Sequence, residues 1–346
     1  MIEKNLDFRS DTVTLPTPEM REAAAKAEVG DDVYCEDPSV NRLERLGAEM
    51  LGKEAAIFVT SGTQGNAISL LAHTQRGDEI ILEAKSHIYL NEVGGLAVLG
   101  GLMPRTIPGE LGWMRPADIE AAIRPPNIHY PKTTLICVEN THNTAGGVPL
   151  TVDQMKADWE VAKKHDMSVH CDGARIFNAA IALNVNVKEL TRYTDSTQFC
   201  LSKGLAAPVG SLVVGTQKFI EKARKYRKML GGGMRQAGII AAPGIIALTK
   251  MVDRLADDHE NAKLLEHGLK EIKGIKILNP VMTNMVYIDV SGLGWTGAQW
   301  KEACAKIGWK SGGGQSPMVR LCTHYGIERE DIESFLMAIK KLTPKI

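Results

Sequence analysis

Long apolar runs and an excess of one charge are both missing from this chain of 346 residues. No uncharged stretch approaches the roughly 20 residues that a membrane-spanning helix needs, so we expect no membrane association. The chain carries 41 basic and 41 acidic residues, and this balance gives no field of one sign that would attract nucleic acid. Any anion that binds here must therefore be held by a local cluster of donors.

The six cysteines form no C-x-x-C pair, so the sequence shows neither a zinc motif nor a dithiol redox motif. Three of them lie inside apolar runs, where a free thiol behaves as a small hydrophobic side chain. Residues 1–7 lack the apolar core of a signal peptide. We therefore expect reduced thiols, no bound metal and a cytoplasmic location.

Short apolar runs rich in β-branched residues alternate with helical patterns between residues 50 and 215. Helices are predicted from residue 62 and over 151–165, where Thr151 is a candidate N-cap. This repetition predicts an α/β fold with a mostly parallel sheet between helices, in which ligands bind beyond the carboxyl ends of the strands. The predicted strands cover residues 55–59, 79–83, 135–139, 168–172, 197–202 and 211–215.

The pattern changes after Gly231-Gly232-Gly233. A long helical pattern runs from about residue 235 to residue 272, and we expect it to be interrupted at Pro243-Gly244. Beyond it, strand-like and helical runs are short and mixed. We therefore expect a large α/β domain with the N-terminal segment over residues 1–250, and a small α+β domain over residues 251–346.

Two predicted strands lead to one ionisable residue each: the run 168–171 leads to Asp172, and the run 197–202 leads to Lys203. Pyridoxal 5'-phosphate is a cofactor with two chemical ends that need such groups. Its aldehyde forms a Schiff base with a lysine, and its ring nitrogen stays protonated when it faces an aspartate. Taken singly, Asp172 could be a helix N-cap and Lys203 a surface lysine. The apolar residues around Lys203 argue against its full exposure.

Two segments are candidates for binding the phosphate. Ser61-Gly62-Thr63 lies between a strand and a helix, where free N–H groups can bind an anion, although the same residues suit a plain helix N-cap. The G-x-G-x-x-G fingerprint of dinucleotide-binding proteins is absent, which argues against a nicotinamide dehydrogenase. Lys228 and Arg235 flank the glycine run, and they fit either a solvated loop or a phosphate contact.

His87 and His142 each follow a predicted strand, and either could act as a general base near neutral pH or serve a structural role. Arg175 lies one helical turn after Asp172 and could pair with that residue or with a substrate carboxylate. Arg320 stands inside an apolar run. It could face an anion, or it could face water on a strand with alternating exposure.

Seven segments together resemble the low-specificity L-threonine aldolases, which are pyridoxal-phosphate enzymes of the aspartate-aminotransferase-like fold, fold type I. The resemblance covers nearly the whole chain. The segments most specific to this family are Arg-Ser-Asp-Thr-Val near the N-terminus and Glu-Asn-Thr-His-Asn. The segments are FRSDTVT (8–14), GDDVY (30–34), SGTQ (61–64), ENTHN (139–143), HCDGAR (170–175), LSKG (201–204) and GGGMRQ (231–236).

The resemblance implies a role for each matching residue. Lys203 would form the Schiff base, Asp172 would face the ring nitrogen, and His87 would stack on the ring. His87 or His142 would be the base, so the sequence leaves that choice open. Gly62, Thr63, Arg175 and Ser202 would contact the cofactor; Lys228 and Arg235 would reach the phosphate of the neighbouring subunit; Ser10, Arg175 and Arg320 would hold the substrate carboxylate; and Tyr34 and His142 would lie near its hydroxyl group.

The implied protein is a homo-oligomer, a dimer or a tetramer, with active sites at the dimer interface. The implied reaction cleaves L-threonine, L-allo-threonine and related β-hydroxy-α-amino acids to glycine and an aldehyde, as in glycine biosynthesis. The nearest alternative is an aminotransferase or a β-eliminating lyase on the same fold. In such an enzyme Lys203 itself would remove the Cα proton of the substrate. A protein that binds a phosphate ligand without catalysis is the alternative from a different class.

Overall fold

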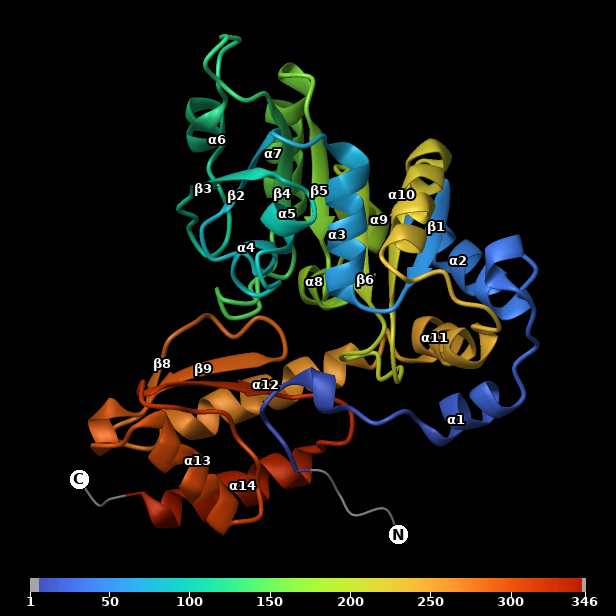
Figure 1. Cartoon of the computed structure of the whole chain (residues 1–346). Helices are drawn as coiled ribbons and strands as arrows, with labels where there is room; N and C mark the ends of the chain where they lie inside the picture. The colour runs from blue at the N-terminus through green and yellow to red at the C-terminus, as the bar shows by residue number, and fades with distance from the viewer. Residues whose placement is uncertain (1–5, 344–346) are drawn as a thin grey trace.

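The computed structural model describes residues 6–343, so the first five residues of the N-terminal segment considered above lie outside it. The molecule has two parts, an upper one built on a large sheet and a lower one built on a small sheet (Figure 1). Within residues 6–343, no helix combines the length and the apolar character that crossing a lipid bilayer requires.

The upper sheet has seven strands in the order β1-β7-β6-β5-β4-β2-β3. Only β7 runs antiparallel to its neighbours, which confirms the mostly parallel sheet of the expected α/β fold. The central strands are buried on both faces because helices cover both sides. The strands are β1 (Ala55–Val59), β2 (Glu79–Glu83), β3 (Met103–Ile107), β4 (Thr133–Glu139), β5 (Ser168–Asp172), β6 (Ser196–Cys200) and β7 (Ser211–Gly215).

Helix α7 begins where the sequence predicts, because Thr151 and Gln154 form a capping box at its N-terminus. Short 3-10 turns occupy Asp11–Val13 and Asp32–Tyr34. The helices of the upper part are α1 (Pro18–Ala25), α2 (Pro38–Leu51), α3 (Gly62–His73), α4 (His87–Leu90), α5 (Gly95–Val98), α6 (Pro116–Ala122), α7 (Val152–Lys164), α8 (Ile176–Leu183), α9 (Val187–Thr191), α10 (Gln217–Met229) and α11 (Gly238–Lys250).

The expected helix interruption at Pro243-Gly244 is wrong. Pro243 lies inside α11, and the chain breaks later, between α11 and α12 (Leu255–Lys270). Proline removes one backbone hydrogen bond, but α11 is buried against α1 and α2, and this packing outweighs the loss. Gly244 assists because a Cβ there would lie only 3.0 Å from Leu43 of α2.

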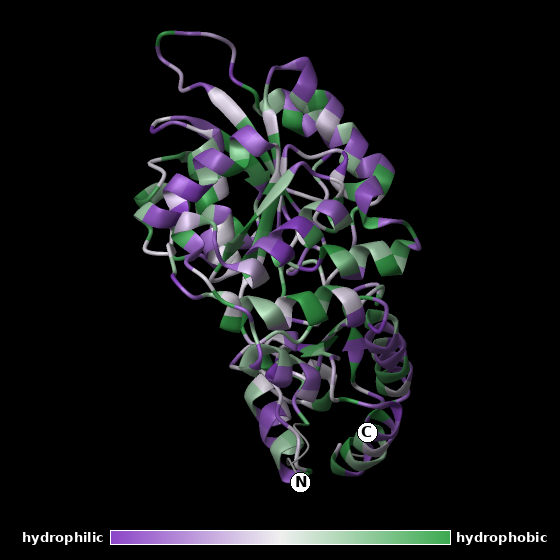
Figure 2. Ribbon diagram, turned by 90° about the vertical axis from the view of Figure 1, so that its right-hand side faces the viewer, coloured by the Kyte–Doolittle hydropathy of each residue, from purple (hydrophilic) through white to green (hydrophobic). Residues whose placement is uncertain are grey.

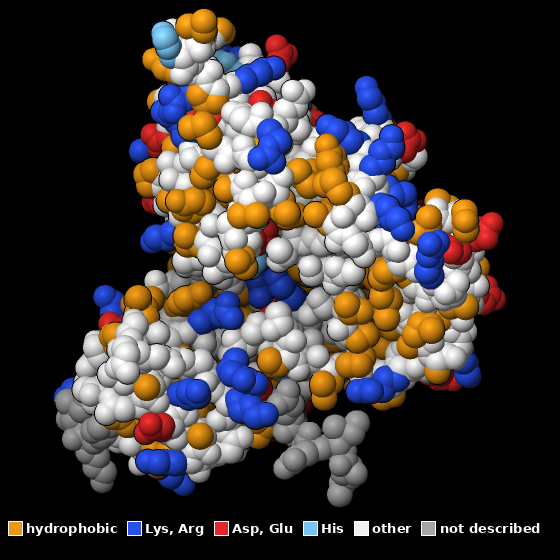
Figure 3. Space-filling view, in the orientation of Figure 1, with side chains coloured by type: hydrophobic (Ala, Val, Ile, Leu, Met, Phe, Trp, Pro, Cys, Tyr) orange, Lys and Arg blue, Asp and Glu red, His pale blue; other side chains and the backbone are white. Residues whose placement is uncertain are grey.

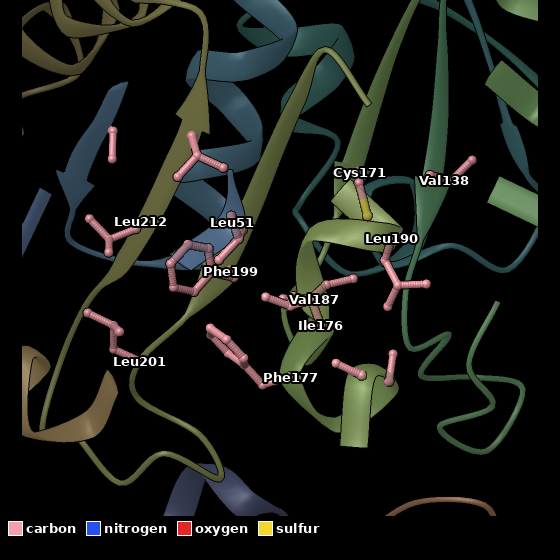
Figure 4. Packing of buried hydrophobic residues seen from close by; sticks show 14 of the residues in the cluster. Leu51, Val138, Cys171, Ile176, Phe177, Val187, Leu190, Phe199, Leu201 and Leu212 are labelled. Atoms are coloured by element: carbon pink, nitrogen blue, oxygen red, sulfur yellow. The ribbon is translucent and has the colours of Figure 1, made fainter. Parts of the chain in front are cut away.

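Alternation along β5 and β6 separates an apolar face from a polar one. Cys171 and Phe199 point into the cluster shown in Figure 4, where Phe177 of α8 meets Phe199 edge to face at 5.6 Å. Their neighbours along the strands point to the opposite face, beneath α3. These neighbours are His170 and Asp172 on β5 and Gln198 on β6. The hydrophobic face thereby fixes the position of the polar one.

The lower part has its own core. Its antiparallel strands are β8 (Lys276–Ile277), β9 (Met285–Asp289) and β10 (Met318–Cys322), packed against α12, α13 (Gly297–Lys306) and α14 (Arg329–Leu342). Figure 2 shows the two parts one above the other, with hydrophilic residues on the outer faces of many helices. Phe8 joins the lower core by stacking on Trp309 at 4.3 Å. The division near residue 250 stays a prediction, because this N-terminal segment crosses it.

Candidate active site

Most of the candidate residues gather where the upper and lower parts meet. Strands β5 and β6 are parallel neighbours, with Asp172 opposite Gln198, so their carboxyl ends deliver Asp172 and the turn that carries Lys203 to one edge of the sheet. Figure 3 shows Lys and Arg side chains around the hollow between the two parts, with histidine and acidic atoms deeper inside. Basic side chains around the hollow can bind the anionic group of a ligand, and acidic side chains deeper inside can face a positively charged ring.

Asp172 is buried and accepts three hydrogen bonds. Oδ1 accepts from Gln198 Nε2 at 2.9 Å and from the backbone N–H of Ala174 at 3.1 Å, and Oδ2 accepts from Asn66 Nδ2 at 2.9 Å. A carboxylate is an acceptor only, so this all-donor set matches its ionised form. Oδ2 takes one protein donor where Oδ1 takes two, which leaves Oδ2 capacity for a further donor.

Lys203 is half-buried in the turn after β6. Its backbone carbonyl accepts a hydrogen bond from Thr14 Oγ1 at 2.9 Å, so the N-terminal segment runs beside it. The charge of Lys203 is among the causes that hold the pKa of Asp11 down, and it also acts on His87, whose pKa is raised by other groups. The amine of Lys203 therefore lies within electrostatic range of both residues.

Arg175 pairs with Asp11, a residue that the sequence did not single out. Its Nε and Nη2 donate to the two carboxylate oxygens of Asp11, each at 2.7 Å, and both side chains are buried. Burial alone would raise the pKa of Asp11, but the charge of Arg175, followed by those of Lys203 and Arg320, holds it well below its usual range. Asp11 thus gathers three cations at the site.

His87 opens the short helix α4 and reaches Glu92 at the other end of the same segment. Its Nδ1 lies 3.2 Å from Glu92 Oε1, and this hydrogen bond raises the pKa of His87. Glu92 is buried, and burial together with the nearby charge of Asp172 raises its own pKa. Single ligand atoms of His87, Glu92 and Asp172 all lie within 4.8 Å of one another. Sequence reasoning missed Glu92 because nothing in its local pattern distinguishes it from a surface glutamate.

His142 is almost completely enclosed, and both ring nitrogens have partners. Nε2 lies 3.0 Å from Glu83 Oε2, and Nδ1 accepts from the backbone N–H of Ala145 at 3.2 Å. Burial would lower the pKa of His142, but the hydrogen bond with Glu83 and the charge of Glu139 outweigh it and raise the pKa. The ring is a donor to Glu83 in this arrangement, with no free lone pair.

Arg320 lies on β10 and points into the seam, half-buried. Its Nη1 donates to Asn143 Oδ1 at 2.9 Å, and its Nη2 donates to the backbone carbonyl of Arg9 at 3.0 Å. Both acceptors are neutral, and within the described part of the chain, residues 6–343, no carboxylate forms an ion pair with this guanidinium. Ser10, next along the chain, caps the turn that presents Asp11.

The N-terminus of α3 lies against β6. Ser61 Oγ accepts from the backbone N–H of Gln64 at 3.1 Å, and the other N–H groups of the first turn have no intrahelical acceptor. A Cβ on Gly62 would come within 3.0 Å of Cys200 Sγ, so glycine lets the helix end approach the sheet closely. Ser202, in the turn before Lys203, is half-exposed. This geometry suits a phosphate group.

Three sequence candidates lie on the outer surface instead. Tyr34 is 71% exposed, Lys228 is exposed at the end of α10, and Arg235 pairs with Asp31 at 2.9 Å on the surface. The glycine turn between Lys228 and Arg235 packs against Gln64 of α3. Among residues 6–343, no hydrogen bond or ion pair joins these three to Asp172 or Lys203.

Comparison with known proteins identifies the family of this chain. The family model for beta-eliminating lyases matches residues 7–292. The chain belongs to the beta-eliminating lyase family. It is 46% identical over 347 residues to low-specificity L-threonine aldolase 1 of Arabidopsis thaliana, covering 99% of this chain and 97% of that protein. It is 44% identical over 330 residues to the low specificity L-threonine aldolase of Escherichia coli K12, covering 94% and 96%.

The fold is found among solved structures as well. A threonine aldolase of Leishmania major matches with a TM-score of 0.83 and 21% identity, covering 97% of this chain and 99% of that one. This match confirms the predicted fold class, and the two relatives confirm the resemblance noted in the sequence.

Proposed function

We propose that this protein is a pyridoxal-phosphate-dependent aldolase that cleaves L-threonine, L-allo-threonine and other β-hydroxy-α-amino acids to glycine and an aldehyde. One observation supports the proposal most: β5 and β6 are parallel neighbours, so Asp172 and the turn that carries Lys203 both follow strands that end at the same edge of the sheet. The kinship with proteins named low-specificity L-threonine aldolases supports the choice of substrate.

The residues present fit the cofactor. Asp172 is buried, all its hydrogen-bond partners are donors, and one oxygen keeps room for another donor, as a partner of a protonated ring nitrogen should. Lys203 would form the Schiff base, the first turn of α3 with Ser202 would hold the phosphate, and His87 would lie over the ring. When bound, the cofactor supplies an electron sink for the pair of electrons released from a bond broken at the substrate Cα.

The side chains around Asp11 would bind and orient the amino acid. Arg320 has neutral acceptors that a substrate carboxylate can replace with a stronger, charge-assisted partner. Arg175 is already held by Asp11, so its role is to fix this wall of the site. Orientation by such a clamp selects which Cα bond stands in line for cleavage.

The hydrogen-bond pattern favours His87 over His142 as the base. With Nδ1 facing Glu92, His87 keeps a lone pair on Nε2 that can accept the proton of the substrate β-hydroxyl group. His142 has both nitrogens engaged and would have to give up the bond from Ala145 first. We therefore place His142 behind the site, where it orients Glu83 and the adjoining loop.

We further propose a homo-oligomer whose neighbouring subunit supplies Lys228 and Arg235 to the phosphate, with Tyr34 near the substrate hydroxyl side. The exposure of these polar residues supports it, as do the exposed apolar side chains beside them, Met229 and Ile239. Figure 3 shows apolar side chains spread over the surface of α11. Five of the six free thiols are buried, and Cys35 is exposed, which is compatible with a reducing compartment such as the cytoplasm.

A product assay tests the proposal. The chain is incubated with pyridoxal 5'-phosphate and either L-threonine or L-allo-threonine, and we expect glycine and acetaldehyde in equal amounts. The family also includes β-eliminating lyases by its description, and that activity would instead give a keto acid and ammonia. Lys203→Ala should abolish turnover. Keto acid without glycine, or full turnover by Lys203→Ala, would reject the aldolase.

A further inference from the structure

A chain of buried hydrogen bonds leads away from Asp172 beneath α3. Asn66 of α3 donates from Nδ2 to Asp172 Oδ2 at 2.9 Å, and its Oδ1 lies 3.1 Å from His170 Nε2. His170 Nδ1 lies 2.8 Å from Ser196 Oγ, which lies 2.7 Å from His73 Nε2. Asn66, His170 and Ser196 are almost completely inaccessible to solvent.

The direction of every bond in this chain follows from its first member. A carboxylate can only accept, so Asn66 presents its NH₂ group to Asp172, and a second bond of 2.8 Å from the same nitrogen reaches Glu92. The Asn66 carbonyl must then accept from an Nε2–H of His170. A neutral His170 therefore accepts at Nδ1 from the Ser196 hydroxyl group, and Ser196 accepts in turn from an Nε2–H of His73.

His170 must be neutral to form this chain, because it donates from Nε2 and accepts at Nδ1, whereas His73 at the end of the chain only donates. Burial lowers the pKa of His170 to about 4 and that of His73 to about 3, so both rings are neutral at pH 7. His73 is further held by stacking on Phe219 at 4.5 Å. All donors thus point the same way, toward the carboxylate.

We propose that His170 is a positioning residue for Asp172: through Asn66, and anchored by Ser196 and His73, it fixes the carboxylate in the orientation that meets the ring nitrogen of the cofactor. This inference rests on the proposed function, since it concerns the same cofactor. Packing alone does not account for His170, because a leucine would fill an inward position of β5 without needing two polar partners. Asn66 also bridges Asp172 to Glu92, so a displaced Asn66 would disturb His87 as well.

The chain offers a matched control. His259 is another buried histidine whose pKa burial lowers to about 4, and its Nε2 lies 3.1 Å from an asparagine, Asn178. Among the residues that the structure describes, no side-chain hydrogen bond joins this pair to Asp172. The variants His170→Leu, His170→Gln and His259→Leu are prepared with the wild type. The dissociation constant of pyridoxal 5'-phosphate and the ¹⁵N signal of its labelled ring nitrogen are measured for each.

We expect His170→Leu to weaken cofactor binding about tenfold and to move the ring-nitrogen signal toward the unprotonated form, because loss of an outer hydrogen-bond partner misorients the inner group. His170→Gln keeps a donor toward Asn66 and should restore most of both values. His259→Leu should leave both unchanged. If His170→Leu matches His259→Leu in both readouts, the proposal is overturned.

A second measurement needs no variant and no cofactor. In the cofactor-free wild type with ¹⁵N-labelled histidine, His170 and His73 should both carry their proton on Nε2. An Nδ1–H tautomer at His170 would reverse the chain and overturn the proposal even if the leucine variant does not fold. Failure of the proposed function has a different signature, namely wild-type protein that does not bind the cofactor or releases no glycine.

Discussion

Arg175 donates two parallel hydrogen bonds of 2.7 Å to Asp11, and neither side chain has appreciable contact with water. The pair joins the N-terminal segment to the start of α8, immediately beside Lys203. A buried ion pair of this kind is costly to break on one side only, because the remaining charge is left without a partner.

Asp11→Asn should therefore destabilise the protein by about 3–5 kcal/mol, since it leaves the buried guanidinium of Arg175 without its counter-charge. Urea denaturation at pH 7 measures the change. Glu22→Gln, which removes the exposed partner of Lys26, is the control and should cost less than about 1 kcal/mol. Equal effects of the two substitutions would contradict the structural importance of the buried pair.

Asp158 makes stability depend on pH. Burial raises its pKa to about 8, and only Oδ1 has a partner, the indole N–H of Trp113 at 3.2 Å. The pKa of this carboxyl group is near 4 in the unfolded chain and higher in the folded protein. Its contribution to stability is therefore fully present below about pH 4 and is lost as the pH rises toward 8. Asp158→Asn should flatten this dependence and raise stability at pH 7 by on the order of 2–3 kcal/mol.

Denaturation of the wild type and Asp158→Asn at pH 5, pH 7 and pH 8.5 tests this. Asp153→Asn, on the exposed face of the same helix, serves as the control and should leave the pH dependence of the wild type intact. Parallel stability curves for the wild type and Asp158→Asn would show that the Asp158 carboxyl group is not the source.

Glu92→Gln should shift the acidic limb of the kcat/KM profile to lower pH. The hydrogen bond with Glu92 raises the pKa of His87, and an amide would remove that charge while keeping an acceptor. The base must be unprotonated to work, so a lower pKa keeps it active in more acidic solution. Glu83→Gln is the matched variant beside His142. A shift with Glu83→Gln and none with Glu92→Gln would assign the base to His142.

Arg320→Ala should raise KM for threonine roughly tenfold to a hundredfold, the value of one charge-assisted hydrogen bond, while cofactor affinity stays the same. Steady-state kinetics and a cofactor titration separate the two effects. Arg329→Ala, an exposed arginine at the start of α14, is the control. An unchanged KM would remove Arg320 from the carboxylate clamp.

Arg235→Ala should release the cofactor more readily, with about a tenfold rise in its dissociation constant, because a phosphate contact is lost. Arg192→Ala, which breaks an exposed pair with Glu189, should have no effect. Mixing inactive Lys203→Ala subunits with Arg235→Ala subunits should restore turnover if Arg235 acts across the interface, since one site of a hybrid dimer is then intact. A hybrid without such recovery would place Arg235 in its own subunit's site.

The sequence predicted the sheet better than the contacts on it. All six predicted strands are present, because their β-branched runs are buried on both faces. Strand β3 (Met103–Ile107) was not predicted, because it is an edge strand that contains Pro104 and Arg105. Proline and charged residues are typical of edge strands, where they discourage pairing with a further strand. The prediction of a helix break at Pro243 was wrong, because the packing of α11 against its neighbours outweighs the local preference of proline.

The order of residues along the strands suggested Asp172 and Lys203, but their partners come from distant parts of the chain. Asn66 lies 106 positions from Asp172, and Asp11 lies 164 positions from Arg175. No local pattern marks either residue, since a mid-helix asparagine and an early aspartate have many ordinary uses. Only the folded arrangement shows that each one completes a buried polar group.

The N-terminal segment connects the lower part to the turn that carries Lys203. Phe8 is anchored on Trp309 in the lower core, and Thr14, six positions on, holds the backbone carbonyl of Lys203. Any hinge movement of the lower part against the large sheet must pull on this short strap and thereby on the lysine itself. A change in the angle between the two parts would therefore change the position of the reactive amine.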